Sequence, residues 1–217
     1  MIIHLNLQGR LVIVIGGGNE ALKRINSLLE EKCQILVISN ELNSQIKTLV
    51  KSKKIKFKKQ KIQNSDILSI YKPYMVITTT NDKKLNQKII NDAKNKKIIA
   101  YSSDNPELSD FANPAIIDFE NTIKIAIFTG GKSPAMSKKL RIESEKIFKK
   151  IITKEDISQI KIQNIAREHA KNTISTQNER KMYLSSIMGD KEIKRLIKDG
   201  QLKRAEKRAI TILRNWK

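Results

Sequence analysis

The chain has 217 residues, enough for one α/β domain with a sizeable core and a smaller appended region. Apolar residues make up 39% and charged residues 30%, which is typical of a soluble globular protein. The apolar runs are too short to span a membrane, nothing at the start resembles a signal peptide, and the single Cys33 excludes an intramolecular disulfide. We therefore expect a cytoplasmic protein with no membrane partner and with Cys33 in the core.

The net charge of +21 is the most unusual bulk property, with 43 Lys and Arg against 22 Asp and Glu. A polyanionic partner, either nucleic acid or a small polycarboxylate, is one explanation. A lysine-rich coding bias that spreads charge over a solvated surface explains it equally well. The aromatic content of only 5% counts against a base-stacking surface, so nucleic acid is the less favoured partner.

The first half of the chain alternates between strand-like and helix-like segments. Leu11–Ile15 is a continuous apolar run, typical of a central parallel strand, and apolar residues then recur at helical spacing up to Leu29. Further strands are expected in residues 33–40, 54–59, 74–82 and 97–104, and further helical segments in residues 41–51, 65–71 and 84–96. This alternation predicts an α/β fold with a Rossmann-like, doubly wound parallel sheet.

The pattern changes after Asp104. Residues 114–118 and 122–129 read as two strands a hairpin apart, and from Pro134 onward the sequence is helical and basic. Amphipathic helices are expected in residues 154–170, 178–188, 190–198 and 201–217. The sequence thus predicts three regions: a Rossmann domain over residues 1–112, a small α+β region over residues 113–150, and an all-helical C-terminal domain over residues 151–217.

A glycine loop follows the first strand. Its residues, Gly16-Gly17-Gly18-Asn19-Glu20-Ala21, fit the dinucleotide-binding pattern G-x-G-x-x-A. Gly16 permits a tight turn, Gly18 lets the backbone approach a pyrophosphate, and Ala21 lets the helix pack closely. A merely structural glycine turn is the alternative, but a buried strand before the loop and an amphipathic helix after it favour dinucleotide binding.

The end of the second strand bears on the choice of dinucleotide. Ser39 and Asn40 stand where a dinucleotide domain usually has an acidic residue for the ribose hydroxyls, and Glu41 follows. Asn40 or Glu41 can make that contact. No arginine stands there to receive a 2′-phosphate, so the sequence favours NAD over NADP.

A threonine run, Thr78, Thr79 and Thr80, ends the fourth strand. In a doubly wound sheet this edge is where the cofactor ring and the substrate meet, and three small hydroxyl residues leave room for a flat ring. A β-branched strand end followed by a capping Asn81 or Asp82 explains the run equally well.

Gly131-Lys132-Ser133 looks like the end of a nucleotide-triphosphate loop. The pattern G-x-x-x-x-G-K-[ST] fails, because its first glycine is an alanine here. Ser133 is instead a good helix N-cap, and Pro134 suits the first helical position. Gly130 and Gly131 let backbone amides converge beside Lys132, which predicts an anion site for a carboxylate or a single phosphate. Plain helix capping is the alternative.

Three stretches together resemble one family. They are "GRLVIVIGGGNEALKR" (residues 9–24), "VITTTNDKKLN" (residues 76–86), and "SSDNPELSDFANPAIID" with "IAIFTGGKSPAMSKKLR" (residues 102–141). Their order and spacing resemble the dehydrogenase/ferrochelatase module at the N-terminus of siroheme synthases. The resemblance is strong over residues 1–150, and the chain looks like the stand-alone form without the methyltransferase domain.

The resemblance implies a function and a partner. It implies oxidation of precorrin-2 to sirohydrochlorin with NAD, an oxidoreductase step of siroheme biosynthesis, and some members also insert Fe²⁺ as a lyase. It further implies a homodimer that interlocks through residues 113–150. Two alternatives remain from the residues themselves: an NAD(H)-sensing or nucleic-acid-binding regulator with a basic helical tail, and a dimeric interaction protein without catalysis.

The resemblance also implies roles for particular residues. Asp104 matches the family's general base, although a turn aspartate before Asn105-Pro106 is the alternative reading. The other matches are Asn19, Glu20, Asn40 and Glu41 to the cofactor contacts, Thr78, Thr79 and Thr80 to the nicotinamide site, and Thr129, Gly130, Gly131, Lys132 and Ser133 to the loop near the tetrapyrrole. The sequence departs from the family at Phe128 and at Ser39-Asn40. It predicts no metal site, since His4 and His169 are far apart and read as structural.

Overall fold

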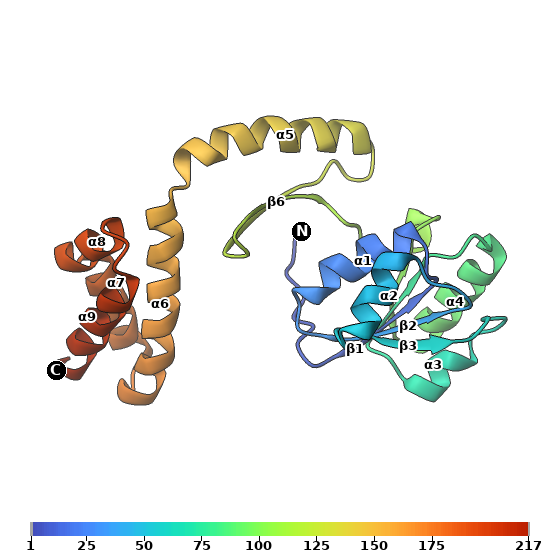
Figure 1. The fold of residues 1–217 in the computed structure, drawn as a ribbon, viewed down its shortest axis with the longest axis horizontal. Helices are drawn as coiled ribbons and strands as arrows, with labels where there is room; N and C mark the ends of the chain where they lie inside the picture. Colours follow the sequence, from blue (N-terminus) through green and yellow to red (C-terminus); the bar gives the residue numbers. More distant parts are fainter. Residues whose placement is uncertain (1, 217) are drawn as a thin grey trace. The chain divides into compact units, whose positions relative to one another are not determined.

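The computed structural model describes residues 2–216, and the chain divides between Asn113 and Pro114 into two compact units. The first unit contains the glycine loop and Asp104, and the second contains the hairpin and the helical region (Figure 1). The three-region division expected from the sequence, with a further boundary near residue 150, stays a prediction.

The first unit is built on a parallel sheet of five strands in the order β3-β2-β1-β4-β5. The strands are β1 (Leu11–Ile15), β2 (Gln34–Ser39), β3 (Lys56–Lys59), β4 (Met75–Thr78) and β5 (Ile99–Ser102). The chain runs outward from β1 through β2 to β3, and then returns to place β4 on the other side of β1. This reversal creates the crevice at which doubly wound sheets bind their ligands, at the carboxyl ends of β1 and β4.

Helices cover both faces of this sheet. They are α1 (Asn19–Leu29), α2 (Ser44–Lys51), α3 (Asp66–Tyr71) and α4 (Lys83–Asn95), followed by a short 3₁₀ helix, η1 (Pro106–Leu108). Val12 and Val14 of β1 pack in one core cluster with residues of α1 and α2, whereas Ile13 and Ile15 pack in another with residues of α3 and α4 (Figure 1). Because side chains alternate along a strand, a strand that is buried on both faces must be apolar throughout. The Rossmann-like fold predicted from the sequence is thereby confirmed.

The second unit begins with an antiparallel hairpin and a long helix. Strands β6 (Ala115–Phe119) and β7 (Ile123–Ile127) pair with Ile117 opposite Ile125, and α5 (Pro134–Ile151) follows. Helix α5 has no buried residue. Apolar side chains on these elements are exposed, namely Ile116, Phe128, Met136, Leu140, Ile142, Ile147 and Ile151.

The remaining helices form a core of their own. They are α6 (Lys154–Thr173), α7 (Gln177–Gly189), α8 (Lys191–Lys198) and α9 (Leu202–Arg214). Tyr183 is fully buried among them, and its hydroxyl donates a hydrogen bond of 3.0 Å to the Ala209 carbonyl. Burial raises the pKa of Tyr183 to about 12. Across residues 2–216, no helix combines the length and apolar character needed to cross a membrane.

Candidate dinucleotide and substrate site

Two glycines of the loop are required by the close approach of other chain segments. A Cβ at Gly16, where φ is +116°, would lie 2.3 Å from Thr79 Oγ1. A Cβ at Gly17 would lie 1.9 Å from the Glu41 carbonyl oxygen. Both distances are far below van der Waals contact, so neither position can carry a side chain without moving the backbone.

Gly18 differs from its two neighbours. A Cβ there would have no atom within 4 Å, so open space faces this position. Gly18 is also the N-cap of α1 and has no side chain to cap the first amides of that helix. The free amides at the positive end of a helix dipole suit an anion such as a pyrophosphate. The residues present therefore fit the diphosphate of a dinucleotide, and its contact with Gly18 stays a prediction.

The rest of the loop serves α1 and its neighbours. Ala21 is fully buried, as its close-packing role requires. The Asn19 side-chain oxygen accepts a hydrogen bond of 3.2 Å from Asn43, and Glu20 forms an ion pair with Lys23 at 3.2 Å. Direct cofactor contacts by Asn19 and Glu20 stay predictions.

At the end of β2, the three predicted contact residues have different surroundings. The Ser39 hydroxyl donates to the Glu41 carbonyl at 2.7 Å, so it is already engaged in the local turn. The side chains of Asn40 and Glu41 are exposed. Contact with the ribose thus stays a prediction for all three residues. The side chains of Asn40 and Glu41 are more available for it than the Ser39 hydroxyl.

The threonine run has a structural partner for each hydroxyl. Thr78 is fully buried and donates to Ser102 Oγ at 3.3 Å. Thr79 donates to the Ile15 carbonyl at 2.9 Å, which ties β4 to β1. Thr80 donates to Asn86 Oδ1 at 2.6 Å and, like Thr79, is half-buried. Only Thr79 and Thr80 are therefore accessible in part to a nicotinamide ring, and that contact stays a prediction.

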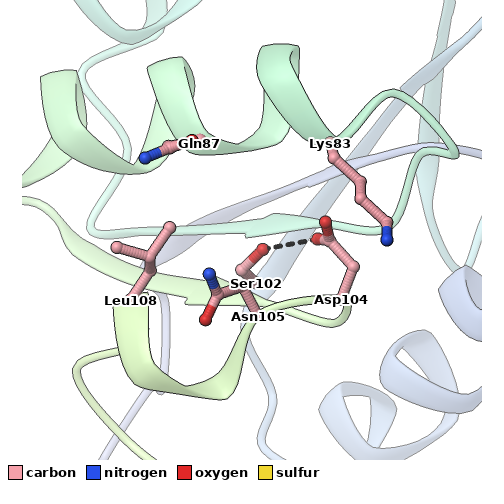
Figure 2. A pocket seen from close by; sticks show the side chains of 6 residues that line it. All are labelled: Lys83, Gln87, Ser102, Asp104, Asn105 and Leu108. Atoms are coloured by element: carbon pink, nitrogen blue, oxygen red, sulfur yellow. Dashed lines mark hydrogen bonds between the residues drawn. The ribbon is translucent and has the colours of Figure 1, made fainter.

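Asp104 follows β5 and borders a cavity of about 230 Å³. Its Oδ1 accepts a hydrogen bond of 2.7 Å from Ser102 Oγ and another of 2.9 Å from Asn86 Nδ2. Figure 2 shows the Lys83 side chain extending from the start of α4 toward the Asp104 carboxylate. The cavity is lined by Lys83, Gln87, Ser102, Asp104, Asn105 and Leu108.

Strand register brings Asp104 to the same sheet edge as the glycine loop. Ile15 of β1 pairs with Thr78 of β4, and Thr78 pairs with Ser102 of β5. The residues after these three positions, including Gly16 and Asp104, therefore all leave the sheet at its carboxyl edge. A parallel sheet collects its functional groups at this edge.

Sequence reasoning missed four residues at this edge: Lys83, Asn86, Gln87 and Ser102. A signal for Asn86 was present, because a polar residue on the apolar face of α4, beside Ile89 and Ile90, must find a buried partner. The chain positions alone could not identify that partner. Asp104 follows 18 residues later and reaches Asn86 only through the pairing of β4 with β5.

The predicted anion loop lies in the second unit. Gly130 and Gly131 both have positive φ, and Ser133 Oγ accepts a hydrogen bond of 3.2 Å from the Met136 amide, which confirms it as the N-cap of α5. Thr129 Oγ1 lies 2.8 Å from Ser137 Oγ. Lys132 is exposed. The capping role is thus established, and substrate contact by this loop stays a prediction.

The possible metal ligands are scattered. Within residues 2–216, no three His, Cys, Asp or Glu side chains come together as a metal-binding group. The His4 side chain is 79% exposed and 3.6 Å from Glu31, and His169 is exposed on α6. Cys33 is half-buried, not fully buried, and desolvation raises its pKa.

Comparison with known proteins identifies an NAD(P)-binding family. Residues 3–115 match a protein family described as "Putative NAD(P)-binding". This match spans more than half of the chain, so the protein belongs to that NAD(P)-binding family. Siroheme synthases are among its relatives, in agreement with the sequence resemblance to the N-terminal module of that family.

Two siroheme synthases illustrate the relationship. The protein from Buchnera aphidicola subsp. Acyrthosiphon pisum is 33% identical over 145 residues, which cover 67% of this chain and 30% of the relative. The protein from Mannheimia succiniciproducens is 26% identical over 203 residues, which cover 93% of this chain and 40% of the relative. The chain thus spans well under half the length of these relatives.

A solved structure shares the fold of the chain. The protein named SirC, precorrin-2 dehydrogenase, superposes with a TM-score of 0.69 at 20% sequence identity. The match covers 95% of this chain and 99% of SirC. At this identity the likeness establishes the fold, including the helical C-terminal region.

Proposed function

We propose that this protein oxidises precorrin-2 to sirohydrochlorin with NAD⁺ as the hydride acceptor, as an oxidoreductase of siroheme biosynthesis. The observation that carries the proposal is the placement of Asp104. Its carboxylate borders a cavity at the same sheet edge as a glycine loop whose Gly18 faces open space. The names of the relatives and of SirC support this choice of substrate.

The reaction removes one hydride and one proton from the tetrapyrrole. NAD⁺, when bound, supplies the hydride acceptor. The chain must supply a base for the proton, and the Asp104 carboxylate is the acidic group that lines the cavity. Its Oδ1 already accepts two hydrogen bonds, which leaves Oδ2 to take the proton.

Cations near the cavity suit a substrate with many carboxylates. Lys83 lines the cavity, and the chain as a whole carries a net charge of +21. A lysine ammonium beside a substrate carboxylate forms a charge-assisted hydrogen bond, and a large positive field speeds the arrival of an anionic ligand. We assign Lys83 to a substrate carboxylate. The loop of Lys132 in the second unit suits another anionic group of the substrate.

NAD rather than NADP is the proposed cofactor. Asn40 and Glu41 at the end of β2 are exposed, and a carboxylate there favours ribose hydroxyls and repels a 2′-phosphate. The test is anaerobic incubation of the protein with precorrin-2 and either NAD⁺ or NADP⁺. We expect NADH formation and a much slower reaction with NADP⁺. No reduced cofactor with either dinucleotide would refute the proposed function, and faster turnover with NADP⁺ would refute only the cofactor assignment.

A homodimer through the hairpin and α5 is part of the proposal. Ile147, Ile151 and Phe128 are each at least 50% exposed, and α5 buries no residue within its own unit. Apolar side chains gathered on consecutive elements are typical of an interface between subunits. A second copy of this chain, with the same exposed side chains, is the proposed occupant.

Fe²⁺ insertion and a regulatory role remain predictions with less support. Addition of Fe²⁺ to purified sirohydrochlorin in the absence of oxygen tests the first. For the second, several cations of α8 and α9 have partners within the unit: Arg195 pairs with Glu192 at 2.7 Å, and Arg208 with Asp190 at 3.2 Å. These pairs reduce the charge available to a nucleic acid.

A further inference from the structure

A buried polar network surrounds one oxygen of Asp104. Asn86 on α4 and Ser102 on β5 are both fully buried, and each donates a hydrogen bond to Asp104 Oδ1. Thr78 and Thr80 extend the network: Thr78 Oγ1 donates to Ser102 Oγ, and Thr80 Oγ1 lies 2.6 Å from Asn86 Oδ1. The network thus joins β4, α4 and β5 behind a single exposed carboxylate.

The hydrogen bonds fix the direction of each donor. The Asn86 amide has two N–H groups, of which one goes to the Thr80 carbonyl at 2.9 Å and the other to Asp104. Its oxygen accepts from the Thr80 hydroxyl, so two hydrogen bonds of opposite direction join Asn86 and Thr80. The single Ser102 proton goes to Asp104, because Ser102 Oγ accepts from Thr78. Neither donor can turn to another acceptor without breaking a buried bond.

The two oxygens of the Asp104 carboxylate differ in their surroundings. Over the residues that the structure describes, no hydrogen bond or ion pair within the protein reaches Oδ2. Asp104 as a whole is exposed, so this second oxygen is open to a ligand. Here both buried donors converge on Oδ1, and the side chain borders the cavity (Figure 2).

We propose that Asn86 and Ser102 are positioning residues that hold Oδ1 of Asp104 and thereby direct Oδ2 to the substrate proton. This inference rests on the proposed function, in which Asp104 is the base. A base must be held within hydrogen-bond reach of the proton that it takes, and a rigid buried network achieves this before the substrate arrives. Asn86 is the principal residue, since its amide connects the base to the threonine run that ends β4.

Kinetics of matched variants test the proposal. Asn86→Asp replaces the donor by a second carboxylate beside Oδ1, and Asn91→Asp makes the same change at an exposed position of the same helix. We expect kcat to fall about 10²-fold for Asn86→Asp, the effect of a misplaced catalytic group, with KM for precorrin-2 and NAD⁺ unchanged. Asn91→Asp should keep the wild-type kcat. An unchanged kcat in Asn86→Asp would overturn the assignment.

Variants of Ser102 provide a second test that disturbs the fold less. Ser102→Ala removes one donor to Oδ1, and Ser102→Thr restores a hydroxyl with an added methyl group. A positioning role predicts a lowered kcat for Ala and a recovery toward wild type for Thr. A role in packing alone predicts that the larger Thr is at least as damaging as Ala, because extra volume in a filled site is destabilising. That second result would overturn the role of Ser102.

A measurement without turnover separates this inference from the proposed function. In the wild-type protein, both Asn86 amide protons are donated, so their NMR signals should exchange slowly with solvent. Asp104→Ala removes one acceptor and should speed exchange of one proton and shift its signal. An Asn86 amide that does not respond would refute the contact itself. A wild-type protein that forms no NADH, with an Asn86 amide that does respond, would instead refute the proposed function and the catalytic meaning of the contact.

Discussion

Thr78 of β4 and Ser102 of β5 lie opposite each other in the parallel register, and the Thr78 hydroxyl donates to Ser102 Oγ at 3.3 Å. Both side chains are fully buried at the carboxyl edge of the sheet. A buried hydroxyl without a hydrogen bond is costly, and here both are bonded. The Ser102 hydroxyl in turn donates a hydrogen bond to Asp104 Oδ1. Hydrogen bonds therefore link the pairing of β4 with β5 directly to the proposed base, Asp104.

The glycine loop gives a matched pair of variants with opposite expected effects. Gly17→Ala should lower the stability of the fold by roughly 1–3 kcal/mol, because its Cβ would lie 1.9 Å from the Glu41 carbonyl oxygen and would force the backbone apart. Gly18→Ala should leave the Tm near wild type but weaken NAD⁺ binding, because the Cβ would enter the open space assigned to the pyrophosphate. Thermal unfolding and calorimetric titration with NAD⁺ measure the two effects. If Gly18→Ala bound NAD⁺ as tightly as wild type, the diphosphate would not lie against this residue.

The proposed homodimer is tested by charge on its apolar face. Ile147→Glu places a carboxylate on α5 at a side chain that is 58% exposed in the single chain. A buried charge without a partner is costly, so we expect this variant to have a solution mass near 24.8 kDa, that of one chain, where the wild type has twice that mass. Lys146→Glu, one residue earlier, is the control and should remain dimeric. Sedimentation analysis decides, and a wild-type protein that is monomeric at all concentrations would rule the dimer out.

Tyr183 predicts a specific loss of stability at high pH. Its pKa is raised from 10.0 to about 12 by burial, so the unfolded chain loses the phenol proton at a lower pH than the folded chain. Stability from the neutral phenol is thus complete below pH 10 and is lost as the pH rises from 10 toward 12. Tyr183→Phe should be destabilised at neutral pH by about 1 kcal/mol, through loss of the bond to the Ala209 carbonyl.

The same variant supplies the contrast at alkaline pH. Since Phe does not titrate, the difference in unfolding free energy between wild type and Tyr183→Phe should shrink as the pH rises through this window. Denaturant unfolding at several pH values measures it. A difference that stays constant from neutral pH to pH 12 would show that Tyr183 titrates normally in the folded protein.

Most of the first unit could be predicted from the sequence because its strands are buried on both faces. Leu11–Ile15 and Gln34–Ser39 are nearly continuous apolar runs, and such runs are typical of central parallel strands. The glycine loop could be predicted for a related reason, since a strand that ends at Ile15 and a helix that begins at Asn19 leave few conformations for the three glycines between them.

The candidate site could be predicted only in part. Its neighbours in the sequence and the resemblance to a family predict Asp104 as the base, and this role stays a prediction. The partners of Asp104 were not predicted, because Asn86 reaches it through the packing of α4 on the sheet, which local pattern does not specify. Thr78 shows the opposite case. The sequence places it at the carboxyl edge of the sheet, where it pairs with Ser102, but its side chain is fully buried there.

Asp104→Asn tests the central claim most directly, since it keeps the size of the side chain and removes its ability to take a proton. The measurement is NADH formation from precorrin-2 and NAD⁺ without oxygen, together with NAD⁺ affinity by calorimetry. We predict that turnover falls by about 10²- to 10⁴-fold, the usual contribution of a general base, while NAD⁺ binds as in wild type. Wild-type turnover in this variant would contradict the assignment of Asp104 as the base.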